Sequence, residues 1–171
     1  MTDEPTADRV PPPSEPVGRS VLFVCTGNTC RSPLAEALCR RMLADRLGVR
    51  ESELSTRGYT VRSAGIAAFP GDAASPEAVD LAAQFGADLS THRSRPVNPE
   101  LLATATDVLA MTAGHLAVLR MRFPTDGPEP QLLAGPHDVP DPIGGTRDDY
   151  EHCAALIAAH LHQRIAEWTR T

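Results

Sequence analysis

A cysteine and an arginine six positions apart, Cys25 and Arg31, are the residues best placed to do chemistry. A thiolate can attack phosphorus, and a planar guanidinium can bind two oxygens of a phosphoryl group. The loop amides, the start of a following helix and Arg31 all favour negative charge on Cys25. We therefore expect a phosphate-binding loop with Cys25 as nucleophile and Arg31 as phosphate clamp. The other loop residues are Thr26, Gly27, Asn28, Thr29, Cys30 and Ser32.

Phosphoryl transfer also needs an acid that protonates the leaving group, and two aspartates, Asp138 and Asp141, are candidates. Both lie in a Pro-rich segment. We choose Asp141. The Asp-Pro pair restricts the backbone and Gly144 and Gly145 then allow it to turn, so this loop can reach over the site. An Asp-Pro pair is also a common turn, so an ordinary turn is the alternative interpretation.

The elements that must position these residues begin with residues 20–24, an uncharged β-rich run typical of a strand covered on both faces. Cys25 follows directly. Strands and helices then alternate, which predicts a three-layer α/β/α domain with a central four-stranded parallel sheet and ligands bound at the carboxyl ends of its strands. The expected later strands are 60–64, 107–111 and 131–133, and the expected helices are 33–47, 76–85, 113–121 and 146–168.

Composition and charge restrict the class of protein that this chain can be. The 171 residues are 42% hydrophobic and carry a net charge of −6, which argues for one domain and against a nucleic-acid binder. We find no apolar run long enough to span a bilayer. The four cysteines lack the spacing of a disulfide framework or a zinc site, so we expect no metal, no cofactor and a cytoplasmic location. Residues 1–19 are expected to be a disordered leader before a domain at 20–171, and Cys39 and Cys153 to pack in helices.

The segment 21–33, Val-Leu-Phe-Val-Cys-Thr-Gly-Asn-Thr-Cys-Arg-Ser-Pro, resembles the signature of the low-molecular-weight protein tyrosine phosphatases. Three further segments agree with that family's pattern in order: Ser63-Ala64-Gly65, His92-Arg93-Ser94-Arg95 and Asp141-Pro142. The resemblance implies a cysteinyl-phosphate on Cys25, with Asp141 first protonating the leaving group and then activating water. It implies a phosphorylated protein as substrate, and we expect a monomer or a weak homodimer.

The resemblance also assigns supporting roles. Ser32 is expected to donate a hydrogen bond to the Cys25 thiolate. Asn28 is expected to hold the loop in shape through contacts with Ser63 and His92. Cys30 matches a family cysteine able to trap oxidised Cys25 as a reversible disulfide, although it can also simply pack.

Two positions bear on the substrate. Many tyrosine-specific members carry a bulky aliphatic residue where this chain has Thr29, and aromatic residues where it has Ile143 and Gly144. Threonine at that position, together with Asp-Pro-x-Gly-Gly, is similar to bacterial protein arginine phosphatases. The threonine there is thought to help orient water. Phosphoarginine therefore stands beside phosphotyrosine as a candidate substrate, and Thr29 can equally be a neutral variant.

Two other functions remain open. Thioredoxin-coupled arsenate reductases resemble this loop but relay a disulfide through further cysteines, and the chain has none between Arg40 and His152. A non-catalytic module that binds phosphorylated residues would keep the loop and lose the nucleophile or the acid.

Overall fold

The structure, a computed structural model, describes residues 18–170. Most of the expected leader, residues 1–17, lies outside the described residues. Arg19 already belongs to the first strand, one residue before the predicted start of the domain.

A four-stranded parallel sheet with the order β2-β1-β3-β4 forms the centre of the fold. Its strands are β1 Arg19–Cys25, β2 Tyr59–Gly65, β3 Asp107–Ala110 and β4 Gln131–Leu132. The helices are α1 Arg31–Leu47, α2 Pro76–Gln84, α3 Pro99–Ala103, α4 Ala113–Arg122 and α5 Arg147–Trp168. Two single-turn 3₁₀ helices, η1 Glu51–Glu53 and η2 Ser55–Arg57, lead into β2.

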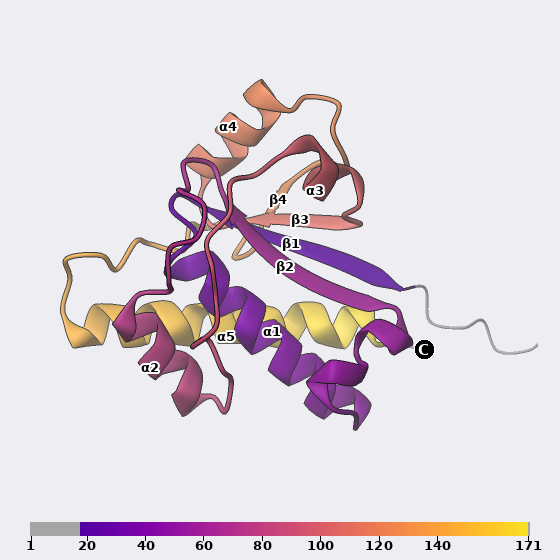
Figure 1. The fold of residues 1–171 in the computed structure, drawn as a ribbon, viewed down its shortest axis with the longest axis vertical. Helices are drawn as coiled ribbons and strands as arrows, with labels where there is room; N and C mark the ends of the chain where they lie inside the picture. The colour runs from indigo at the N-terminus through magenta and orange to yellow at the C-terminus, as the bar shows by residue number, and fades with distance from the viewer. Residues whose placement is uncertain (1–17, 171) are drawn as a thin grey trace, which may run out of the picture.

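The helices cover both faces of the sheet, which confirms the predicted three-layer architecture. Helices α1, α2 and α5 share one buried cluster on one face, whereas α3 and α4 lie on the other (Figure 1). Strand β1 alternates between the two layers: Phe23 belongs to the larger cluster, and its neighbours Leu22 and Val24 belong to the smaller one. Burial on both faces explains why this strand has no charged residue between 20 and 25, and it holds Cys25 rigidly at the strand's carboxyl end.

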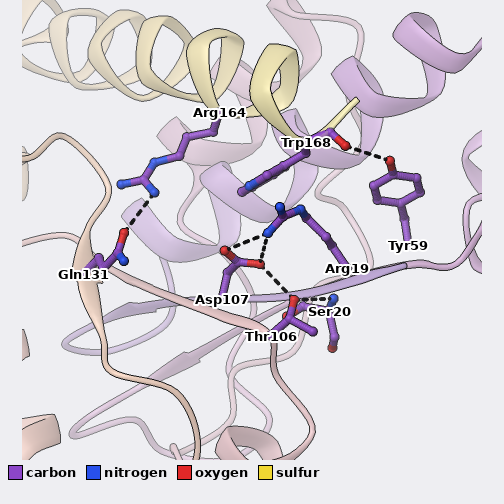
Figure 2. A network of polar contacts seen from close by, with 8 residues as sticks. All are labelled: Arg19, Ser20, Tyr59, Thr106, Asp107, Gln131, Arg164 and Trp168. Carbon is purple, nitrogen blue, oxygen red and sulfur yellow. Dashed lines mark hydrogen bonds and ion pairs between the residues drawn. The ribbon is translucent and has the colours of Figure 1, made fainter. Parts of the chain in front are cut away.

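The opposite end of the sheet is closed by polar contacts. Arg19 Nη1 donates to both carboxylate oxygens of Asp107, at 3.2 and 3.0 Å, and its guanidinium lies 5.8 Å from the centre of the Trp168 ring (Figure 2). The Tyr59 hydroxyl donates to the Trp168 carbonyl at 3.4 Å. These contacts join the starts of β1, β2 and β3 to the end of α5, far from Cys25.

The predicted elements are confirmed, with ends displaced by one or two residues. Helix α1 begins at Arg31 rather than Pro33, and β4 has only two residues. The prediction missed η1, η2 and α3. Each has five residues or fewer, which is too short for a helical period to show.

Candidate active site

The loop between β1 and α1 is anchored through its carbonyl oxygens. The backbone amides of Ile66 and Ala67 donate to the carbonyls of Cys25 and Thr26, both at 3.0 Å, and Ser75 N donates to the carbonyl of Thr29 at 2.8 Å. The loop therefore depends on the segment that follows β2. Amide N–H groups of such a loop, next to the start of α1, suit a bound anion.

Asn28 connects the loop to two other segments, β2 and residues 92–95. It is fully buried and has a positive φ of 55°, which asparagine tolerates better than most residues. Its Nδ2 donates to Ser63 Oγ at 2.9 Å, its Oδ1 accepts from Arg95 N at 3.0 Å, and its carbonyl accepts from His92 Nε2 at 2.8 Å. The structure thus brings Asn28, Ser63 and His92 together, and these bonds offset the strain of the positive φ.

The thiol of Cys25 lies inside this arrangement. Its Sγ is 2.9 Å from Ser32 Oγ, and both residues are buried. Asn28 Nδ2 also donates to Ser32 Oγ at 2.9 Å. The hydroxyl of Ser32 is therefore held between the amide of Asn28 and the thiol.

Arg31 joins the loop to the segment that carries the candidate acid. Its side chain is 6% exposed, Nη1 donates to the Val139 carbonyl at 3.0 Å, and Nη2 lies 3.4 Å from Asp141 Oδ2. Asp141 is 46% exposed, so it can meet a substrate. Asp138, the alternative acid, accepts at 2.8 Å from Ala113 N and caps the start of α4. The geometry favours Asp141 over Asp138.

Comparison with known proteins decides the family. The model of the low molecular weight phosphotyrosine protein phosphatases matches residues 20–171. The chain belongs to this family. It is accordingly a hydrolase of the low-molecular-weight protein-tyrosine-phosphatase type.

Relatives of this phosphatase differ in the substrate that their names give. The protein-arginine-phosphatase of Bacillus subtilis is 39% identical over 148 residues, which are 84% of this chain and 92% of the relative. A low molecular weight protein-tyrosine-phosphatase of Streptomyces coelicolor is 34% identical over 152 residues, 81% and 87% of the two chains. A solved YwlE arginine phosphatase mutant with a phosphorylated active-site serine has a TM-score of 0.75 and 35% identity, and the match covers 86% of this chain and 94% of that one.

The candidate specificity residues of the phosphatase lie in two loops. Thr29 is half-buried, and its Oγ1 lies 3.8 Å from the position that a Cβ on Gly27 would take. Ile143, two residues after Asp141, is 65% exposed. The sequence prediction missed Phe69, which is 77% exposed in the loop after β2 and whose carbonyl accepts from Ser94 Oγ. Its sequence signal is weak: a single aromatic residue in a loop.

The other cysteines of the phosphatase are buried and free. Burial raises the pKa of the Cys30 thiol to about 11, although a hydrogen bond with the Ser75 side chain opposes this. Burial likewise raises the pKa of Cys153 to about 12 and that of Cys39 further. Core packing is confirmed for Cys39 and Cys153. A redox role for Cys30 stays a prediction.

His115 is a second neighbour of the loop that the sequence prediction missed. It lies in the first turn of α4, and its Nε2 is 2.8 Å from Thr26 Oγ1. Burial and then the charge of Arg31 lower its pKa to about 4, against opposing effects of Asp138 and Asp141. Its position just after the carboxyl end of the third strand is the signal that could have identified it.

Glu36 is the third missed residue. Its Oε2 accepts from Ser63 Oγ at 2.5 Å. Glu36 stands four positions after Ser32 on α1, so both side chains are on the same face of the helix. That spacing could have linked Glu36 to the loop.

Within residues 18–170 no three or more His, Cys, Asp or Glu side chains gather as a metal site would require. Over the same residues no helix is long and apolar enough to cross a membrane.

Proposed function

We propose that this chain is a cysteine-dependent protein phosphatase that removes phosphate from arginine side chains through a cysteinyl-phosphate, with phosphotyrosine as the second candidate substrate. The proposal rests on one observation: a thiol, a guanidinium and a carboxylate lie together at the carboxyl end of β1. The thiol of Cys25 and the guanidinium of Arg31 share one loop, and Asp141 faces that guanidinium at 3.4 Å.

The first step transfers the phosphoryl group to sulfur. The Cys25 thiolate forms a bond to phosphorus while the bond from phosphorus to the leaving nitrogen or oxygen breaks. That atom takes the proton of Asp141 as it departs. Arg31 and the loop amides bind the non-bridging oxygens, where negative charge is concentrated in the transition state.

The second step restores the enzyme. The Asp141 carboxylate takes a proton from water, the water oxygen bonds to phosphorus, and the sulfur–phosphorus bond breaks. Orthophosphate leaves, Cys25 is again a thiolate, and Asp141 is again protonated. A relative solved with a phosphorylated active-site serine supports a covalent intermediate at the nucleophile position.

The choice of phosphoarginine rests on Thr29 and on the sequence after Asp141. The chain has the threonine and the Asp-Pro-x-Gly-Gly pattern that resemble the arginine phosphatases, and 39% identity to the Bacillus subtilis protein supports the same choice. The exposed Phe69 favours the second candidate, because its ring can pack against a phenyl leaving group.

Parallel kinetics test the substrate. We expect the wild-type enzyme to hydrolyse a phosphoarginine peptide with a higher kcat/KM than a matched phosphotyrosine peptide. Thr29→Ile should lower kcat/KM for phosphoarginine by about tenfold or more, while sparing phosphotyrosine. Wild-type enzyme that hydrolyses phosphotyrosine and leaves phosphoarginine intact would contradict the first candidate and favour the second.

We further propose a cytoplasmic location and a phosphorylated protein as the partner. The free thiols of Cys25, Cys30, Cys39 and Cys153 support a reducing compartment.

A further inference from the structure

An unbroken chain of hydrogen bonds runs from a carboxylate on α1 to the thiol. Glu36 Oε2 lies 2.5 Å from Ser63 Oγ, and Ser63 Oγ lies 2.9 Å from Asn28 Nδ2. The same Nδ2 lies 2.9 Å from Ser32 Oγ, which lies 2.9 Å from the Sγ of Cys25. Four contacts therefore separate the carboxylate from the nucleophile.

The carboxylate sets the direction of the Ser63 proton, and the amide of Asn28 sets the direction of the remaining bonds. An ionised carboxylate only accepts, so the single hydroxyl proton of Ser63 goes to Glu36. The oxygen of Ser63 is then free to accept one N–H of Asn28. The other N–H of Asn28 is donated to Ser32 Oγ. The hydroxyl proton of Ser32 is then free to be donated to the sulfur, because the competing acceptor, the Ala64 carbonyl oxygen, is 3.4 Å from Ser32 Oγ.

The amide of Asn28 cannot turn over and reverse the chain. Its Oδ1 accepts from Arg95 N at 3.0 Å, and this backbone donor fixes the side-chain oxygen on the side away from the two serines. The direction of the chain is thus determined at both Asn28 and Glu36.

We propose that Glu36 is a positioning residue: its carboxylate takes the Ser63 proton and so keeps the Ser63 oxygen as an acceptor for Asn28, whose amide holds Ser32 to donate to the Cys25 thiolate. A hydrogen bond donated to an anion stabilises it, so Glu36 raises the fraction of Cys25 present as thiolate without touching the sulfur or the substrate. An effect of Glu36 on phosphate hydrolysis rests on the proposed function, whereas its effect on the ionisation of Cys25 does not.

The surroundings of Glu36 contain several other ionisable groups. Arg40, one turn later on α1, lies 4.0 Å from Glu36 and 3.8 Å from Glu51 of η1. His92 and Arg95 line the same cavity of about 430 Å³ as these three residues. The side chain of Glu36 is only 13% exposed at the edge of this cavity. Glu51 therefore offers a matched control, because it faces Arg40 in the same cavity and makes no contact with Ser63.

The test is the rate at which iodoacetamide alkylates Cys25 as a function of pH, followed by mass spectrometry, in Glu36→Gln and Glu51→Gln. We expect Glu36→Gln to slow alkylation near pH 7 by about fivefold, the size of one weakened hydrogen bond to an anion. The difference should vanish at high pH, where the thiol ionises without help. Glu51→Gln should alkylate like the wild type. Cys25→Ser identifies signal from the other cysteines.

A double-mutant cycle with Ser63→Ala separates positioning from a loss of structure. If Glu36 acts through Ser63, Glu36→Gln should add nothing in the Ser63→Ala background. The proposal would be overturned if Glu36→Gln were alkylated at the wild-type rate, or if Glu51→Gln slowed alkylation as much as Glu36→Gln does. It would also be overturned if the effects of Glu36→Gln and Ser63→Ala on the rate were fully additive. Because alkylation requires no phosphorylated substrate, the proposal can fail or succeed whatever the enzyme's substrate is.

Discussion

Cys25 and Arg31 owe their placement to contacts made by the residues around them. Asn28 binds Ser63 in β2 and the segment of residues 92–95, and Ser32 is held between Asn28 and the sulfur. The Cys25 thiol lies beside the Ser32 hydroxyl. Burial raises the pKa of the Cys30 thiol to about 11, so Cys30 stays protonated at neutral pH.

His115 predicts a pH dependence of stability at the residue scale. Its pKa of about 4 lies below its ordinary value of 6.5, so between these values the unfolded chain binds a proton that the folded chain does not. The free energy of unfolding should fall as the pH drops through this range, by up to about 2 kcal/mol at pH 5. Urea unfolding of the wild type and of His115→Gln at pH 7 and pH 5 measures this contribution.

We expect His115→Gln to lose less stability than the wild type between these pH values. His162→Gln, which removes an exposed histidine of α5, should keep the wild-type dependence. Identical pH dependence in the wild type and His115→Gln would show that burial of His115 has no such effect.

At the scale of elements, the phosphate loop depends on how closely β2 approaches it. A Cβ on Gly65 would lie 2.4 Å from the Thr26 carbonyl oxygen and 3.0 Å from Asn28 N. Gly65→Ala must therefore displace the loop backbone. We expect the free energy of unfolding to fall by about 2 kcal/mol and hydrolysis of p-nitrophenyl phosphate to fall with it.

The control is Gly114→Ala in α4, where the nearest atom to an added Cβ is at 3.5 Å. Urea unfolding of this variant should show equal or greater stability, because alanine favours the helix. A stable, fully active Gly65→Ala enzyme would mean that the loop adapts to the extra methyl group.

Most strands and helices could be predicted, because each has a recognisable pattern in the local sequence. The uncharged run before Cys25 and the Pro and Gly residues around the helices placed most elements within two residues. The contacts between loops could not be predicted in this way. Asn28 meets Ser63 across 35 positions and Arg31 meets the Val139 carbonyl across 108, and no local pattern encodes such pairs. His115 was missed for the same reason, because it meets Thr26 across 89 positions. Glu36 and Phe69 have only weak local signals: a spacing of four residues from Ser32 and a single aromatic residue in a loop.

Across the molecule as a whole, the Arg19–Asp107 ion pair and the candidate active site lie at opposite ends of the sheet. Arg19 and Asp107 lie at the starts of β1 and β3, whereas Cys25 ends β1 (Figures 1 and 2). We expect Asp107→Asn to lower the free energy of unfolding by about 1 kcal/mol, because the pair is only partly shielded from water. Its kcat/KM on p-nitrophenyl phosphate should stay within about twofold of the wild type.

Thermal or urea unfolding and steady-state kinetics on the same preparation give both quantities. A large loss of turnover in folded Asp107→Asn enzyme would show that the two ends of the sheet are coupled.

The proposed mechanism requires a covalent phosphoryl group on Cys25, and this intermediate can be trapped. Asp141→Asn slows the attack of water, while p-nitrophenyl phosphate needs little protonation to leave, so the phosphoenzyme should accumulate. Rapid quenching and mass spectrometry should show one added phosphoryl group, located on Cys25 and absent from Cys25→Ala, which has no nucleophilic atom at this position. A phosphoryl group on another residue, or full turnover by Cys25→Ser, would contradict the mechanism.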